Sequence, residues 1–359
     1  MKIVCNCQSL TEAITNVQRA VSTKSNNPAL EGILFKANAN SLGITTSLPA
    51  EVLSEGSVVL SAKLISDIVR RLPAETVSID TNEKLMTTII SGAVDFKIIG
   101  MSADEYPDIP SVKGDSNIII KGEILSSMIS QTLFAIADSD IKPVQKGSLF
   151  EIESNIIKII SVDGYRLAMR TENLICGEKK SFIIPGKSLA EVVKLIKDNE
   201  KDVEIVVGDK HIIFKIDNYS VISRLIEGEF MNYSAAIPSS HKTEIKVNTR
   251  KFISSLDRMS LLLSERIKTP VRCNIENGVV KLSCSTVLGQ AYDEFDIEMS
   301  GDSVEIGFNV RYMLDALRNT DTDEVKICLS GPTSPMVILP SDGDSFLFLV
   351  LPVRLKNEN

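Results

Sequence analysis

A chain of 359 residues is long enough for two or three domains with substantial cores, and its hydrophobic content of 43% is ordinary for globular proteins. The formal net charge of -8 argues against a protein coated in nucleic acid, although it leaves room for a local basic face. The N-terminal stretch turns polar too early for a signal peptide, and no apolar run approaches the ~18 residues of a membrane span, so we expect a cytoplasmic protein.

Cys5 and Cys7 form the first chemically distinctive pair along the chain, and a strand would place both on one face. Four more cysteines are scattered through the sequence, and the reducing cytoplasm favours their use as small core hydrophobes. Only His211 and His241 are available to join a cysteine as metal ligands. The sequence therefore predicts no metal site and no cofactor.

The first predicted helix spans residues 9–22, where Leu10, Ile14 and Val17 recur at steps of three and four residues. The segment "PALEGILF" follows it. Two similar amphipathic stretches occur at 123–137 and 251–265, and the segments after them, "PVQKGSLF" and "PVRCNIE", resemble the first one. This self-similarity predicts three copies of one structural unit.

A second helix is predicted in each copy, in the stretches "SAKLISDIVRRLP", "PGKSLAEVVKLIKD" and "NVRYMLDALRNT". Aligning these stretches places basic residues at two positions, seven residues apart, in every copy: Lys63 and Arg70, Lys187 and Lys194, and Arg311 and Arg318. Residues seven apart share a helix face. A solvated helix face explains any single one of them, but their recurrence in three copies favours a surface that faces nucleic acid.

Short runs rich in Ile and Val, such as "NIIIKG", "VEIVVGD" and "FLFLVL", surround the helices and predict strands. The fold class is therefore α+β, with three tandem similar domains that each contain two helices and antiparallel sheets. Stretches with clustered Pro, Ser and charge indicate linkers near 101–116 and 233–244. They predict domains at residues 1–115, 116–241 and 242–359.

Catalytic motifs are missing from the sequence. Asp163 precedes Gly164, and Asp-Gly is foremost a turn. Neither histidine stands in a nucleophile motif, and no P-loop or dinucleotide fingerprint occurs. We therefore expect no catalytic residue.

Several segments resemble the bacterial DNA sliding clamps, the beta subunits of DNA polymerase III. They occur in that family's order: "VVLSAKLISDIVRRLP" (58–73), "DEYPDIP" (104–110), "SVDGYRLAMR" (161–170), "GFNVRYMLDAL" (307–317) and "LPVRL" (351–355). The resemblance implies a head-to-tail homodimeric ring with the DNA clamp fold. Such a ring encircles duplex DNA, slides along it and acts in replication as a non-catalytic processivity factor. The implied partners are the polymerase III catalytic subunit, the clamp loader and other replication and repair proteins.

The repeated basic positions and the resemblance together predict a sequence-independent DNA-binding surface. The recurring helix positions are its main members. The resemblance adds Lys24 and Lys142, each of which precedes a proline-containing segment. Arg71 and Lys197 flank the same helix faces. The full set is Lys24, Lys63, Arg70, Arg71, Lys142, Lys187, Lys194, Lys197, Arg311 and Arg318.

The resemblance also implies a groove between the second and third domains that takes short linear peptides from partners. Its residues would be Gly164, Tyr165, Arg166, Leu167, Met231, Ala236, Asn309, Tyr312, Leu349, Leu351, Pro352, Val353, Arg354 and Leu355. The simpler interpretation of "FLFLVL" is a last core strand, and both hold if alternate side chains face opposite ways. Pro352 should end the strand pairing and free the following residues to line the groove.

The sequence departs from the family pattern at the predicted groove. Gln145 stands where the family often has an apolar residue, and Met231 stands where it often has proline. Ala235 and Ala236 replace bulkier residues. We therefore expect a wider or shallower groove that the flexible Met231 side chain can reshape. The first domain is also shorter than usual near "LGITTSLPAEVLSEGS".

The subunit interface is implied by the resemblance at Phe96 and Ile98 in the first domain and at Leu262 and Leu263 in the third. Carboxylates of the segment 293–298 make one edge of the third domain acidic, which fits either an interface or a solvated strand.

Two further functions stay open. One is an enzyme or small-ligand protein that reuses the three-domain scaffold, and the other is a peptide-binding adaptor that never touches DNA.

Overall fold

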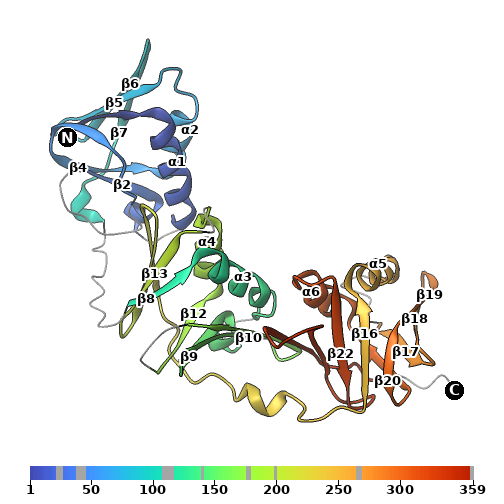
Figure 1. The fold of residues 1–359 in the computed structure, drawn as a ribbon. Helices are drawn as coiled ribbons and strands as arrows, with labels where there is room; N and C mark the ends of the chain where they lie inside the picture. The colour runs from blue at the N-terminus through green and yellow to red at the C-terminus, as the bar shows by residue number, and fades with distance from the viewer. Residues whose placement is uncertain are drawn as a thin grey trace. The chain divides into compact units, whose positions relative to one another are not determined.

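The computed structural model describes residues 1–21, 27–37, 46–106, 117–138, 141–174, 179–197, 200–263 and 269–355 (Figure 1). The chain divides into two compact units. The first unit combines Met1–Gly122 with Lys194–Ser223, and the second combines Glu123–Val193 with Arg224–Asn359. The predicted boundary at residue 115 lies outside the described residues, and both predicted domain boundaries stay predictions.

The first unit contains two helices of the N-terminal repeat and three antiparallel sheets. Its helices are α1 (Cys7–Val17) and α2 (Ala62–Val69). A five-stranded sheet has the order β3-β1-β5-β6-β7, a pair joins β2 and β4, and a four-stranded sheet has the order β15-β14-β13-β8. The strands are β1 (Lys2–Asn6), β2 (Gly32–Ala37), β3 (Ala50–Ser54), β4 (Gly56–Ser61), β5 (Thr76–Thr81), β6 (Met86–Ser91), β7 (Val94–Ile99), β8 (Asn117–Lys121), β13 (Asp202–Val207), β14 (His211–Ile216) and β15 (Tyr219–Arg224).

The second unit contains the remaining helices and two antiparallel sheets. The helices are α3 (Gly122–Leu133), α4 (Gly186–Leu195), α5 (Thr249–Ser260) and α6 (Val310–Arg318). The first residue of α3 and the last two residues of α4 are assigned to the first unit. A nine-stranded sheet has the order β12-β9-β10-β11-β24-β23-β22-β16-β20, and a four-stranded sheet has the order β19-β18-β17-β21. The strands are β9 (Gly147–Glu153), β10 (Ile156–Val162), β11 (Arg166–Asn173), β12 (Lys180–Pro185), β16 (Thr243–Asn248), β17 (Val271–Glu276), β18 (Val279–Thr286), β19 (Gly289–Asp296), β20 (Glu298–Gly301), β21 (Val304–Phe308), β22 (Glu324–Leu329), β23 (Met336–Pro340) and β24 (Phe346–Val350).

The predicted α+β class and threefold repetition are confirmed by the order of the elements. A strand, a helix, further strands, a second helix and more strands follow one another three times along the chain. The helices α2, α4 and α6 begin at Ala62, Gly186 and Val310, so each aligned basic residue is the second residue of its helix. The helices are shorter than predicted, and α5 ends at Ser260 rather than near residue 265. Leu262 and Leu263 therefore lie in the turn after α5.

Buried apolar faces account for the stability of these elements. In the first unit, Leu10 and Ile14 of α1 join a core with Ile65 of α2 and Ile79 of β5. The side chain of Asn6 caps α1 by accepting a 3.0 Å hydrogen bond from the amide of Ser9. Within the described residues, the cysteines are buried free thiols, as predicted. In the same part of the chain no helix is long and apolar enough to cross a membrane.

Candidate functional site

The six repeated basic residues are all exposed at the two ends of α2, α4 and α6. Lys63, Lys187 and Arg311 stand at the start of each helix. Arg318 ends α6 and Arg70 caps α2. Lys142 is also exposed, before the 3-10 helix Pro143–Lys146, whereas Lys24 lies outside the described residues. The structure therefore presents each described basic side chain to solvent, as DNA contact requires.

Acidic neighbours compensate several of these cations. Arg318 pairs with Asp257 of α5 at 2.6 Å, and Arg71 pairs with Asp67 one helical turn earlier at 3.3 Å. Lys197 pairs with Glu12 of α1. The sequence alignment did not reveal these partners, because two of the three lie far away along the chain. Exposed ion pairs of this kind contribute little, ~0–1 kcal/mol, so a phosphate can compete for the cation.

The turn between β10 and β11 is built by Asp163. Its Oδ1 accepts hydrogen bonds from the amides of Tyr165 (2.9 Å) and Arg166 (3.0 Å). Gly164 has a φ of +92°, a conformation that favours glycine. The Asp-Gly pair therefore acts as a turn, as predicted, and it presents Tyr165 with 61% of its surface exposed.

Arg166 links this turn to helix α6. Its side chain is only 12% exposed, its Nε donates to Oδ2 of Asp163 at 2.9 Å, and its Nη1 pairs with Asp315. The guanidinium lies 4.7 Å from the ring centroid of Tyr312 and 5.6 Å from that of Phe134. These contacts leave Arg166 little freedom and make it a rigid support for its neighbours.

Two tyrosines stack beside Arg166. The rings of Tyr165 and Tyr312 are 5.9 Å apart at 23°, one from the turn and one from α6. Burial raises the pKa of Tyr312, and the charge of Asp163 adds to this rise. Asn309 caps α6, with Oδ1 accepting a 2.9 Å hydrogen bond from the amide of Arg311. The four predicted groove residues Tyr165, Arg166, Asn309 and Tyr312 thus lie at the junction of β11 and α6.

The strand β24 is a core strand that pairs with β11. Leu349 pairs with Leu167 of β11, and both side chains are buried in a cluster that the segment around Ile237 also covers. Phe346 and Phe348 point to the other face and pack into a second core. Successive side chains of β24 therefore pack into cores on opposite faces of the sheet, which supports the core-strand interpretation of "FLFLVL", while the lining of a peptide groove by this strand stays a prediction.

The tail after β24 stays close to the protein. The amide of Leu351 donates to the carbonyl of Tyr165 at 2.9 Å, and the amide of Val353 donates to the carbonyl of Gly307 at 2.8 Å. The expectation that Pro352 frees the following residues from pairing is therefore wrong for Val353, since β21 provides a new acceptor. Leu351 and Val353 are each 36% exposed, and Arg354 is exposed as well.

Two of the departures from the family pattern, Gln145 and Met231, contact each other. The Nε2 of Gln145 lies 4.0 Å from Sδ of Met231, and Gln145 is buried while Met231 is 40% exposed. Ala236 is half-buried at the end of the 3-10 helix Tyr233–Ala236. The expected effect on groove shape stays a prediction, but the polar contact gives Met231 a defined resting place.

The predicted interface residues belong to different compact units, Phe96 and Ile98 to the first and Leu262 and Leu263 to the second. Phe96 is 37% exposed on β7, an edge strand, while Ile98 packs against the first core. Leu262 and Leu263 are half-buried against the core of the C-terminal repeat. In the acidic segment, Asp293 pairs with Arg258. Burial of the Asp293 carboxyl raises its pKa, but hydrogen bonds from Ser255 and Arg258 outweigh this effect, so the pKa of Asp293 is lowered.

Comparisons with known proteins agree along the whole chain. Residues 1–110, 119–232 and 234–354 match the N-terminal, central and C-terminal domains of the DNA polymerase III beta subunit. A beta sliding clamp of Staphylococcus aureus is 33% identical over 361 residues, which cover 95% of this chain and 96% of the relative. A DNA polymerase III beta subunit structure from Eubacterium rectale has a TM-score of 0.94 and 34% identity, covering 98% and 99% of the two chains. The DNA polymerase sliding clamp of Bacillus subtilis also has a TM-score of 0.94, with 30% identity and coverage of 99% and 100%.

Proposed function

The chain belongs to the DNA polymerase III beta subunit family, and on that premise we propose that it is a sliding clamp that acts as a processivity factor in DNA replication. The observation that carries this proposal is the match of three consecutive segments to all three domains of the family. This family is non-catalytic, so we discard the alternative that the chain is an enzyme built on the three-domain scaffold.

The working assembly is a homodimeric ring that encircles duplex DNA. Six similar domains from two chains surround the duplex, and a head-to-tail arrangement closes when the rotation between chains allows it. Exposed basic residues at the ends of α2, α4 and α6 support phosphate contacts, which are sequence-independent and permit sliding. The acidic net charge of -8 keeps the rest of the surface from binding DNA tightly.

Partners dock on the groove formed by the turn at Tyr165, the start of α6 and the tail at Leu351 and Val353. We assign to it peptides of the polymerase III catalytic subunit, the clamp loader and other replication and repair proteins. Exposed apolar side chains beside a few fixed polar groups are the usual composition of such a site. The domain limits 1–115, 116–241 and 242–359 and a cytoplasmic location complete the proposal.

Retention on circular DNA tests the function directly. The clamp loader places the purified protein on a nicked circular plasmid, and the complex is separated by gel filtration. Retention on the circle and loss after linearisation are expected, because a ring escapes only over a free end. Equal retention on circular and linear DNA contradicts encirclement, and no retention with an active loader contradicts the clamp function.

A further inference from the structure

One row of cross-strand partners crosses the nine-stranded sheet away from the proposed groove. Leu167 pairs with Leu349, Leu349 with Val337, Val337 with Cys328, and Cys328 with Glu244. Directly opposed residues of neighbouring strands project to the same face of a sheet. Cys328 and Glu244 therefore lie on the face that also bears Leu349, a few strands farther along.

His241 adds a third ligand-type side chain from the segment that precedes β16. Its Nε2 lies 3.2 Å from Oε2 of Glu244, and the same oxygen lies 4.0 Å from Sγ of Cys328. The three donor atoms all lie within 4.8 Å of one another. Cys328 is buried, Glu244 is half-buried and His241 is exposed, so the cluster runs from the sheet to solvent.

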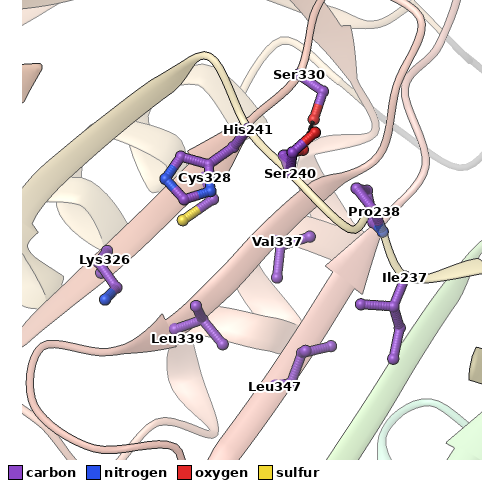
Figure 2. Close-up of a pocket in the computed structure, with 10 residues that line it drawn as sticks. All are labelled: Ile237, Pro238, Ser240, His241, Lys326, Cys328, Ser330, Val337, Leu339 and Leu347. Atoms are coloured by element: carbon purple, nitrogen blue, oxygen red, sulfur yellow. Dashed lines mark hydrogen bonds between the residues drawn. The ribbon is translucent and has the colours of Figure 1, made fainter. Parts of the chain in front are cut away.

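A pocket opens beside this cluster (Figure 2). His241 and Cys328 lie together on its polar side, and the apolar side chains of Ile237, Val337 and Leu347 line the remainder. The pocket gives an ion held by the cluster direct access to solvent. It also leaves room for one ligand that the protein does not supply.

The donor set favours zinc over the other common divalent cations. Thiolate sulfur, imidazole nitrogen and carboxylate oxygen are the ligands of protein-bound Zn²⁺, whereas Mg²⁺ and Ca²⁺ prefer oxygen alone. Typical bond lengths in a tetrahedral site separate nitrogen and oxygen ligands by about 3.3 Å and oxygen and sulfur ligands by about 3.5 Å. The observed 3.2 and 4.0 Å are close to these separations.

The charges around the cluster are compatible with a bound dication. Lys326 lies two residues from Cys328 on the same strand and lines the same pocket. Zinc neutralises the thiolate and the carboxylate together, which removes their mutual repulsion. Lys326 weakens the attraction for a cation, and this predicts moderate rather than extreme affinity.

We propose that His241, Glu244 and Cys328 form a three-ligand site for Zn²⁺, with a fourth coordination position open to the pocket and filled by water. Binding breaks the S–H bond of Cys328 and forms a sulfur–zinc bond; the proton passes to the solvent, and no redox change occurs. The site goes beyond the clamp function and does not depend on it. The sequence analysis predicted no metal site, because only the β16–β22 pairing brings Cys328 to the other two ligands.

The test uses the full chain after chelator treatment and Co²⁺ as a spectroscopic substitute for Zn²⁺. We expect a thiolate-to-cobalt charge-transfer band that saturates at one ion per chain and is displaced by Zn²⁺. Cys328→Ser should remove the band, and His241→Ala should weaken Co²⁺ and Zn²⁺ binding at least tenfold. Because His241 is exposed, its replacement should leave the melting temperature of the metal-free protein unchanged.

Cys284→Ser is the matched control, because this thiol is buried in the same unit but does not line the pocket. It should keep the band and the affinity. The proposal is overturned if the wild-type chain gives no charge-transfer band. It is equally overturned if His241→Ala binds both ions as tightly as the wild type, or if the band survives Cys328→Ser.

Discussion

The amide nitrogen of Val353 donates a 2.8 Å hydrogen bond to the carbonyl oxygen of Gly307, which holds the tail against the end of β21. A Cβ atom at position 307 would lie 2.6 Å from the carbonyl oxygen of Val353 and 2.6 Å from Cδ2 of Leu355. Real Cβ atoms do not approach so closely, so only glycine allows the tail to lie here. The direction in which the tail leaves β24 thus depends on a residue 46 positions before Val353, with one helix and three strands between the two.

Gly307→Ala should displace the tail and weaken binding of a polymerase peptide by at least tenfold, as measured by fluorescence anisotropy. Val353→Ala should cost roughly 1 kcal/mol of apolar contact, or about fivefold in affinity. Val287→Ala, on the exposed turn between β18 and β19, is the matched control and should have no effect. Full-strength peptide binding by both groove variants would show that the tail has only a structural role.

Arg166→Ala should lower the free energy of unfolding by about 2–4 kcal/mol, because Asp163 and Asp315 lose their common cation in a mostly buried place. Arg224→Ala removes an exposed pair with Glu227 and should cost no more than about 1 kcal/mol. Urea denaturation of both variants measures the difference. Equal midpoints for the two variants would contradict the role of Arg166 as a support.

Replacing the six repeated basic helix residues by Ala should weaken DNA binding about equally for every sequence. It should also flatten the dependence of log K on log salt, because each lost phosphate contact removes ~0.9 from the slope. A control with the same charge change uses exposed lysines outside the helices: Lys84, Lys97, Lys121, Lys210, Lys215 and Lys242. The assignment fails if helix variant and control show the same slope.

Phe96→Asp should shift the protein from dimer to monomer in sedimentation experiments, since a charge would replace an apolar contact of the proposed interface. Ile99→Asp places the same charge on the opposite face of β7, where Ile99 is 68% exposed, and should leave the dimer intact. A monomeric wild-type protein at micromolar concentration would remove the basis of the ring.

Stability should fall above pH 9. Burial raises the pKa of the Cys273 thiol from 9.0 to about 12, so the folded protein keeps this proton while the unfolded chain releases it. The stabilisation from Cys273 is complete below pH 9 and is lost as the pH rises towards 12. Between pH 9 and 11 the melting temperature of Cys273→Ala should therefore fall less steeply than that of the wild type. Parallel curves for the two proteins would contradict this.

Sequence patterns predicted the parts of the fold that depend on local periodicity and repetition. The starts of α2, α4 and α6 at equivalent residues follow from the alignment that places Lys63, Lys187 and Arg311 together. The Asp163–Gly164 turn was equally readable, because its hydrogen bonds are local.

Long-range partners were not predictable in this way. Asp315 is far from Arg166 along the chain, and the two meet because β11 pairs with β24 while α6 packs against β24. Periodicity contains no information about such pairings. The same holds for Cys328, which the sequence indicated as a core thiol and which cross-strand pairing places beside Glu244.

The position of β24 between β11 and β23 has a consequence for biosynthesis. The ribosome synthesises this strand after every other strand of the nine-stranded sheet. The edges of β11 and β23 that pair with β24 therefore stay unpaired until β24 has been synthesised. Open edges invite pairing with other chains. Newly made protein should therefore be most prone to aggregation just before residues 346–350 leave the ribosome, and chaperone binding should be strongest at that stage of translation.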